Sequence, residues 1–256
     1  MAKTIALAGK GGVGKTTICG LLITYLAEKR KGAILAVDAD ANSNLNEVLG
    51  LEIETTLGDI REEMEHAEDS EKTKLPGGMT KAEYAEMQFM RALAEGDDFD
   101  LLVMGRTQGA GCYCFVNGIL SAQVAKYSGN YSYVVVDNEA GMEHISRGIL
   151  PKVDVILMVS DCSVRGVQAA AKIFELAKSL KLGAKEMKLI INRAPASGPS
   201  ENVLKEVEKA GMEILCVLPQ DETVYEYDAD ARPTTELPKD NEFRKQLYQA
   251  LDELNL

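Results

Sequence analysis

The chain has 256 residues, of which 46% are hydrophobic and 27% are charged, and its formal net charge at pH 7 is −12. This length is sufficient for one large α/β domain with a substantial buried core. The excess of acidic residues argues against nonspecific binding to nucleic acid or to an anionic membrane surface, because both need clustered Lys and Arg side chains. We therefore expect neither nucleic acid nor membrane as a partner.

The start of the chain and its cysteine content indicate a compartment. Residues 1–4 lead directly into a strand pattern, and no apolar run approaches the ~18 residues that a membrane-spanning helix needs. The number of cysteines is five, which is odd. We expect a cytoplasmic protein with reduced thiols, in which a close cysteine pair binds metal or is redox-active rather than structural.

Short apolar runs alternate with helical patterns along most of the chain. Strands are predicted over 5–8, 33–37, 100–104, 133–136, 155–159, 189–191 and 214–218, and helices over 15–29, 115–127, 164–180 and 241–254. Continuous apolar strands that alternate with helices are typical of a parallel sheet covered on both faces. The predicted fold class is α/β, with a doubly wound, mostly parallel sheet in a single domain over 1–256.

Residues 52–98 interrupt this alternation. An acidic stretch over 62–71 is followed by the turn signal Pro-Gly-Gly at 76–78. We interpret this region as a solvated, acidic helical insertion. Its methionines Met79, Met87 and Met90 are expected to pack in a helical core rather than to bind a soft metal.

Residues 9–16 read Gly-Lys-Gly-Gly-Val-Gly-Lys-Thr and match the phosphate-binding pattern G-x-x-x-x-G-K-[ST] between a predicted strand and a predicted helix. Backbone N–H groups of such a loop surround phosphate oxygens, and the helix N-terminus adds partial positive charge. We expect Lys15 to contact the β- and γ-phosphates and Thr16 to bind Mg²⁺ through its hydroxyl. The ATP- or ADP-binding residues predicted in this loop are Gly11, Gly12, Val13, Gly14, Lys15, Thr16 and Thr17.

Lys10 places a second lysine in this loop, and with it the chain resembles the deviant Walker A ATPases, a class that includes MinD, ParA and the nitrogenase iron protein. The resemblance implies a P-loop NTPase fold and a homodimer that encloses two nucleotides, with Lys10 reaching the partner's phosphates. It also implies slow hydrolysis of ATP to ADP and phosphate. Lys10, Lys15 and Asp40 would be the catalytic residues, with Asp40 orienting the attacking water.

Further residues at predicted strand ends match that class. By this resemblance Asp38 lies near Mg²⁺, and Asp137, at the end of a Walker B-like run, holds Mg²⁺ through water. Gly141 follows in a segment that could sense the γ-phosphate. The residues matched to the adenine site are Asn192, as the base-reading asparagine, and Pro219 and Asp221, in the loop beside the base.

Cys112 and Cys114 are separated by a single residue. Residues i and i+2 of an extended chain point to the same side, so both sulfurs can face one thiophilic metal. Two thiolates do not complete a four-coordinate site, but a loop on the two-fold axis of a dimer would supply four. The alternative is a pair of ordinary surface thiols or a redox couple. The remaining cysteines, expected to be small buried or half-buried residues, are Cys19, Cys162 and Cys216.

The chain resembles the CooC and AcsF nickel-insertion ATPases in two runs, Gly-Cys-Tyr-Cys at 111–114 and Asp-Asn-Glu-Ala-Gly-Met-Glu-His at 137–144. Two further segments, 102–106 and 160–166, resemble AcsF more than CooC. That family matures carbon monoxide dehydrogenase and acetyl-CoA synthase. The resemblance implies an ATP-dependent chaperone that binds Ni²⁺, with Zn²⁺ as another occupant, between the Cys112 and Cys114 thiolates of two subunits. Dimerisation would depend on nucleotide and metal, and the client would be one of those nickel enzymes. His144 is interpreted as a switch, interface or structural residue.

Two other functions remain open. A MinD- or ParA-like positioning ATPase would carry a basic patch or an amphipathic anchor, and neither pattern is present in the sequence. A carrier of a [4Fe–4S] cluster, like the nitrogenase iron protein, would use four cysteines per dimer. That protein, however, takes its cysteines from two separated segments.

Overall fold

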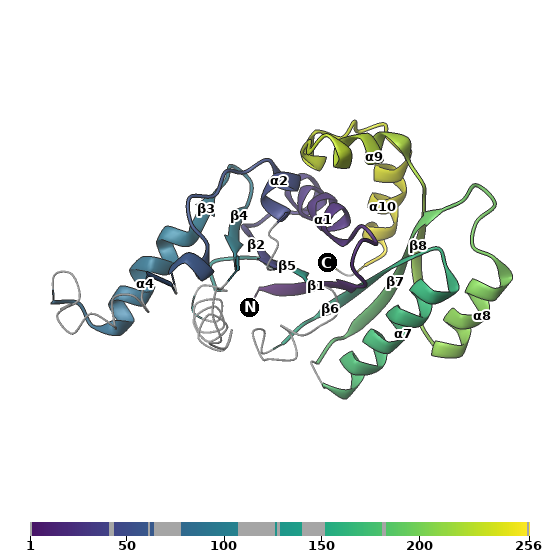
Figure 1. The fold of residues 1–256 in the computed structure, drawn as a ribbon, viewed down its shortest axis with the longest axis horizontal. Coiled ribbons are helices and arrows are strands. Elements are labelled where there is room, and N and C mark those ends of the chain that lie inside the picture. Colours follow the sequence, from purple (N-terminus) through teal and green to yellow (C-terminus); the bar gives the residue numbers. More distant parts are fainter. Residues whose placement is uncertain are drawn as a thin grey trace.

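The computed structural model describes residues 2–40, 44–60, 62–63, 78–106, 126, 129–139, 152–180, 183–254 and 256. These residues form an eight-stranded sheet in the order β3-β4-β2-β5-β1-β6-β7-β8 (Figure 1). The strands are β1 Lys3–Gly9, β2 Ile34–Ala39, β3 Leu93–Glu95, β4 Asp100–Val103, β5 Tyr133–Asn138, β6 Val155–Asp161, β7 Glu186–Ala194 and β8 Ile214–Pro219. The β3–β4 pair is antiparallel and the other pairs are parallel, so the predicted mostly parallel α/β sheet is confirmed.

Helices cover both faces of the sheet (Figure 1). They are α1 Lys15–Lys29, α2 Leu45–Leu49, α4 Lys81–Ala92, α7 Val164–Ser179, α8 Glu201–Ala210, α9 Glu222–Ala229 and α10 Glu242–Asp252, with a 3₁₀ turn, η2, at Thr234–Glu236. None of the described helices is long and apolar enough to cross a membrane.

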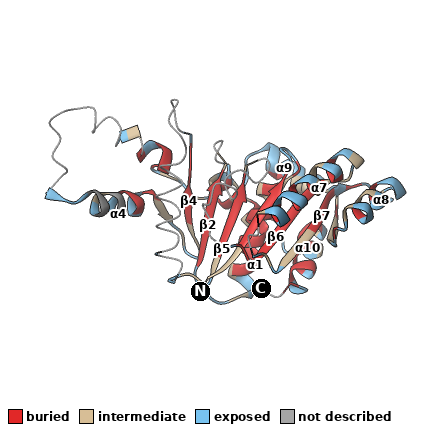
Figure 2. Cartoon of the chain, turned by 90° about the horizontal axis from the view of Figure 1, so that it is seen from below, coloured by how far each residue is buried: buried red, intermediate tan, exposed pale blue. Residues whose placement is uncertain are grey.

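Alternate residues of the central strands supply two separate cores. In β1, Ile5 and Leu7 belong to the cluster that contains the apolar residues of α1 and α10. Ala6 and Ala8 belong to the cluster that contains those of α7. Successive side chains of a strand point to opposite faces, so a strand that is buried on both faces reads as an unbroken apolar run. Figure 2 shows the central strands as the most continuously buried part of the molecule.

The order of the strands determines where the nucleotide loop lies. β1 pairs with β5 on one side and with β6 on the other. The chain moves from β1 toward one edge of the sheet through β2 and β4, and toward the other edge through β6, β7 and β8. The end of β1 is therefore a point where the topology changes direction, and ligands of open α/β sheets bind outside the carboxyl ends of strands at such points.

The acidic insertion contributes α4 and the antiparallel edge strand β3, and β3 was not predicted. Met79, Met87 and Met90 are 36%, 42% and 46% exposed, so the expectation that they pack in a core is wrong. The physical reason is the position of α4, which extends beyond the sheet edge (Figure 1). Only one face of the helix is covered, Met87 and Met90 lie outside that face, and Met79 precedes the helix. The helix predicted over 115–127 lies outside the described residues apart from Lys126.

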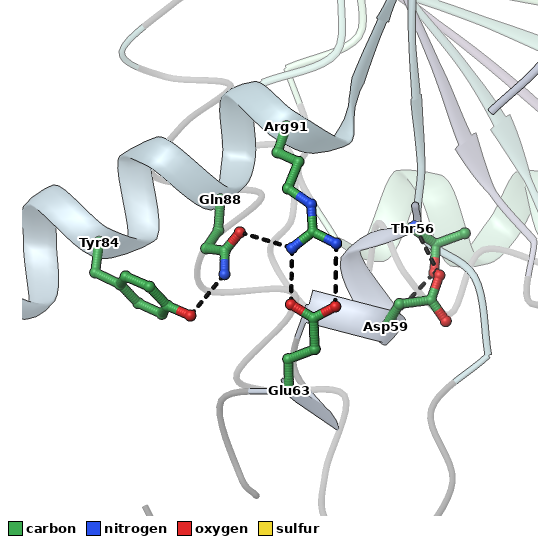
Figure 3. Close-up of polar contacts among 6 residues, drawn as sticks. All are labelled: Thr56, Asp59, Glu63, Tyr84, Gln88 and Arg91. Carbon is green, nitrogen blue, oxygen red and sulfur yellow. Dashed lines mark hydrogen bonds and ion pairs between the residues drawn. The ribbon is translucent and has the colours of Figure 1, made fainter. Parts of the chain in front are cut away.

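Helix α4 is held through its covered face (Figure 3). Phe89 is 2% exposed and belongs to the core cluster shared with β4. Arg91 donates from both terminal nitrogens to Glu63, at 2.8 and 3.1 Å. Gln88 accepts from Arg91 at 3.3 Å and donates to the Tyr84 hydroxyl at 2.7 Å. At its start, Thr80 and Glu83 form a reciprocal capping box.

Apolar burial should contribute more than the ion pair to the attachment of α4. The Arg91–Glu63 side chains are 48% and 45% exposed, and ion pairs this accessible to water contribute little to stability. Phe89→Ala should lower the free energy of unfolding by about 3 kcal/mol, whereas Arg91→Ala and Met87→Ala should each lower it far less. Urea unfolding of the three variants tests this order. A cost for Arg91→Ala equal to that for Phe89→Ala would contradict it.

Candidate nucleotide-binding site

The phosphate loop connects the end of β1 to the start of α1. Gly12 and Gly14 have φ angles of 78° and 92°, in the left-handed region that L side chains rarely adopt. Gly14 precedes α1 without a side-chain cap, and the first turn of the helix contains no acidic residue. The first N–H groups of a helix have no partner within the helix. In this loop they lack a capping side chain as well, so they are available to an anionic ligand.

The two lysines of the loop differ in burial. Lys15 is 7% exposed, and its ammonium nitrogen donates to the Lys10 carbonyl at 3.2 Å. The side chain therefore folds over its own loop, where phosphate would replace the carbonyl as its partner. Lys10 is exposed. An exposed position is what an interaction with a partner chain requires, but the role of Lys10 in a dimer stays a prediction.

Two carboxyl groups lie side by side behind this loop. Asp38 of β2 and Asp137 of β5 are register partners, and each is 1% exposed. Both Asp38 oxygens accept backbone N–H groups, from Asp40 at 2.9 Å and from Leu45 at 3.0 Å. Burial nevertheless raises the pKa of Asp38 to about 6. Asp38 therefore organises the backbone that follows β2.

The Asp137 carboxyl group lies beside the Thr16 hydroxyl. It shares a hydrogen bond with Thr16, and burial raises its pKa to about 7, with the Asp38 charge acting in the same direction. Its Oδ1 atom is buried and finds no hydrogen-bond partner in the described part of the chain. An unpartnered carboxylate oxygen beside a hydroxyl fits a hard cation such as Mg²⁺. The geometry therefore fits Mg²⁺ beside Thr16 and Asp137, and their role as its ligands stays a prediction.

Asn138, next to Asp137, is a buried residue whose role was not predicted. Its side-chain nitrogen donates to the Leu7 carbonyl of β1 at 2.7 Å, across the β1–β5 pair. This bond joins the strand that carries Asp137 to the strand that leads into the phosphate loop.

A pocket of about 310 Å³ opens beside the loop. It is lined by Gly14, Thr17, Asn192, Arg193, Pro219, Gln220, Asp221, Val224, Tyr225, Asp228 and Phe243. The structure thus brings together five residues that the sequence predicted for nucleotide binding, from the loop, from β7 and from the end of β8. Mixed polar and apolar walls suit a nucleoside. Pocket residues of α9 and α10 were not predicted, because no motif marks them.

Two of the pocket residues are already engaged in hydrogen bonds. Asp221 caps α9 by accepting from the Val224 N–H at 2.9 Å, and its other oxygen accepts from Asn241 at 3.1 Å. Asn192 donates to the Val13 carbonyl at 2.9 Å and accepts from the Arg193 N–H at 2.9 Å. Their contacts with the base stay predictions, and in this structure both side chains organise the protein.

The predicted thiolate site and part of the switch lie outside the described residues. This applies to Cys112, Cys114, Gly141 and His144. Asp40 is described and half-buried, but residues 41–43 after it are not, so its catalytic role stays a prediction. Among the described residues, no group of three or more His, Cys, Asp or Glu side chains has an arrangement that could hold a metal.

The other cysteines have the environments that we expected. Cys19 is buried, and Cys162 and Cys216 are half-buried. Burial raises the pKa of each thiol, and it raises that of Cys216 to about 12. A thiol that stays protonated at neutral pH is a poor nucleophile and a poor metal ligand. These three residues are therefore packing residues.

Comparisons with known proteins agree with this geometry. An uncharacterised ATP-binding protein of Methanocaldococcus jannaschii is 40% identical over 252 residues, which cover 98% of this chain and 97% of that protein. The carbon monoxide dehydrogenase accessory protein CooC of Rhodospirillum rubrum is 31% identical over 190 residues, 69% of each chain.

The fold has solved counterparts. The septum site-determining protein MinD of Pyrococcus horikoshii, in complex with Mg-ADP, superposes with a TM-score of 0.71 at 20% identity, covering 100% of this chain and 96% of that one. A family model described as the CobQ/CobB/MinD/ParA nucleotide binding domain matches residues 4–234. With its phosphate loop, its paired buried carboxyl groups and its adjoining pocket, the chain belongs to this family of nucleotide-binding proteins.

Proposed function

We propose that this protein is an ATP-hydrolysing nickel chaperone that works as a homodimer and supplies a nickel enzyme of carbon monoxide or acetyl-CoA metabolism. The observation that carries the proposal is the Cys112-Tyr-Cys114 run in a chain of this nucleotide-binding family. Similarity to a protein named as a carbon monoxide dehydrogenase accessory protein supports it. The resemblance to AcsF-type sequences makes acetyl-CoA synthase the favoured client.

The nucleotide chemistry follows from the residues around the loop. Lys15 would leave the Lys10 carbonyl and bind the β- and γ-phosphates. Thr16 and Asp137 would hold Mg²⁺, which would offset phosphate charge. Asp40 would orient a water molecule for in-line attack on the γ-phosphate, and Lys10 of the partner chain would stabilise the charge that develops.

The metal is the cargo of this cycle. One Cys112 and one Cys114 thiolate from each subunit would complete a four-sulfur site only when the dimer closes. Nucleotide state would set the dimer geometry and hence the affinity for Ni²⁺. Hydrolysis would thereby be coupled to release of the metal.

The metal site predicts a defined stoichiometry. Reduced protein with a non-hydrolysable ATP analogue, titrated anaerobically with Ni²⁺, should bind one metal per two chains. The Cys112→Ser/Cys114→Ser variant should lose this site, and Cys216→Ala should keep it because Cys216 is a protonated packing residue. Metal analysis combined with light scattering measures both quantities. An ATP-driven dimer without stoichiometric metal would instead favour a positioning ATPase, a reading that the match to a family including MinD and ParA leaves open.

The two lysines should have separable roles. Lys15→Ala should weaken binding of ATP and ADP to the monomer, because Lys15 lies within the loop. Lys10→Ala should leave ADP affinity within about twofold but lower the hydrolysis rate by about 100-fold or more, as expected when a charge supplied in trans is removed. Isothermal titration and phosphate release distinguish the two effects. Equal loss of ADP affinity in both variants would exclude a role of Lys10 in trans.

The buried carboxyl of Asp137 should lower stability when no cation is bound. Its folded pKa of about 7 lies above the unfolded value of 3.8, so the cost of ionisation to folding grows between those pH values and is fully present above them. Asp137→Asn should raise the free energy of unfolding at pH 7.5 without Mg²⁺ by about 1–3 kcal/mol, and this gain should shrink as pH falls toward 4. It should also abolish the effect of Mg²⁺ on nucleotide affinity. A variant less stable than wild type at both pH values would contradict this account.

A further inference from the structure

Arg193 has an unusual backbone conformation at the end of β7. Its φ angle is 57°, and the described residues contain one other non-glycine residue with positive φ, Ala231. Left-handed backbone is unfavourable for L residues with a side chain and persists where the surroundings enforce it. The β7–β8 register also shifts between Ile191 and Ala194. The strand is therefore distorted at the point where it reaches the phosphate loop.

This distortion directs two consecutive side chains to the same target. In a regular strand, Asn192 and Arg193 would point to opposite faces of the sheet. Here Asn192 donates to the Val13 carbonyl at 2.9 Å, and Arg193 donates to the Gly12 carbonyl at 2.9 Å. The Asn192 carboxamide is itself held by the Arg193 N–H. Both side chains thus bind the carbonyls of successive peptides in the loop.

Binding a carbonyl fixes the N–H of the same peptide. A trans peptide is planar, with its C=O and N–H pointing in opposite directions. The bond from Arg193 to the Gly12 carbonyl therefore orients the Val13 N–H, and the bond from Asn192 to the Val13 carbonyl orients the Gly14 N–H. Successive N–H groups pointing into one concavity form an anion-binding nest. Without these hydrogen bonds, Gly12 and Gly14 would leave the backbone of this segment with high conformational freedom.

We propose that Arg193 and Asn192 are positioning residues that preorganise the phosphate loop by holding the Gly12 and Val13 carbonyls from outside. Neither side chain needs to touch phosphate for this role. The left-handed backbone at Arg193 is the conformation that lets both reach the loop. The proposal concerns nucleotide binding alone and holds whichever cargo or client the protein serves.

The key variant is Arg193→Gly, which removes the guanidinium and permits the positive φ. Ala231→Gly is the matched control, because it relieves the same backbone conformation away from the loop. Displacement of a fluorescent ADP analogue measures affinity for ADP and for inorganic pyrophosphate. We expect Arg193→Gly to weaken both by about tenfold, the loss of roughly one charge-assisted hydrogen bond. Ala231→Gly should leave both affinities unchanged.

Pyrophosphate distinguishes the loop from the adjoining pocket, which Arg193 also lines. A loss confined to ADP, with pyrophosphate affinity unchanged, would mean that Arg193 acts on the nucleoside and would overturn the proposal. Thermal melting completes the comparison, since Arg193→Gly should melt within about 4 °C of wild type. A larger fall in melting temperature would assign Arg193 to the stability of the fold and would also overturn it.

The salt dependence of ADP affinity distinguishes a positioning role of Arg193 from direct attraction between its charge and the phosphates. Attraction between an exposed charge and phosphate is screened as ionic strength rises. A positioning effect depends on a 2.9 Å hydrogen bond from Arg193 to an uncharged carbonyl of the same chain, so the ratio of wild-type to Arg193→Gly affinity should stay constant between low and high salt. A ratio that falls to one at high salt would refute the proposal.

Discussion

The parallel pairing of β1 with β5 and β6 is the constraint on which the rest of the site depends. It sets Leu7 beside Asp137 and Gly9 beside Val159, and the further pairing of β5 with β2 sets Asp137 beside Asp38. Parallel strands end at the same edge of a sheet, so residues that are far apart in the sequence, such as Gly9 and Val159, meet there. The phosphate loop leaves β1 close to these carboxyl groups, and Thr16 after the loop shares a hydrogen bond with Asp137.

This arrangement has an energetic cost that the fold offsets elsewhere. Asp38 and Asp137 are both almost fully buried, and burial raises both pKa values. Asp38 is satisfied by two backbone N–H groups, whereas the described residues supply no hydrogen-bond partner for one oxygen of Asp137. The two apolar layers on either face of the sheet provide the stability that tolerates such a group. A site prepared for a cation and an anion is thus maintained at the expense of local stability.

The loop itself is held from several directions. Lys15 binds the Lys10 carbonyl from within, and Asn192 and Arg193 bind the next carbonyls from β7. Asn138 joins β5 to β1 just before the loop. A glycine-rich segment has high conformational freedom by itself, so its order here comes from side chains on other strands. Nucleotide therefore meets a loop whose peptide orientations are largely set.

Much of the fold and part of the site were predictable from sequence. Unbroken apolar runs such as 155–159 indicated buried parallel strands, because strands covered on both faces need no polar alternation. The loop at residues 9–16 was recognisable, since its chemistry depends on local spacing. The edge strand β3 and the exposure of Met87 and Met90 were missed, because burial of an amphipathic helix depends on what lies beside it.

The sequence by itself therefore determined the parallel strands and the phosphate loop, because each is encoded in local order and spacing. Only the tertiary structure decided which side chains share a hydrogen bond. Arg193 carries no motif, and its contact with Gly12 arises from a left-handed backbone at the end of a strand 181 residues away. Such long-range contacts depend on register and packing, which no local pattern specifies.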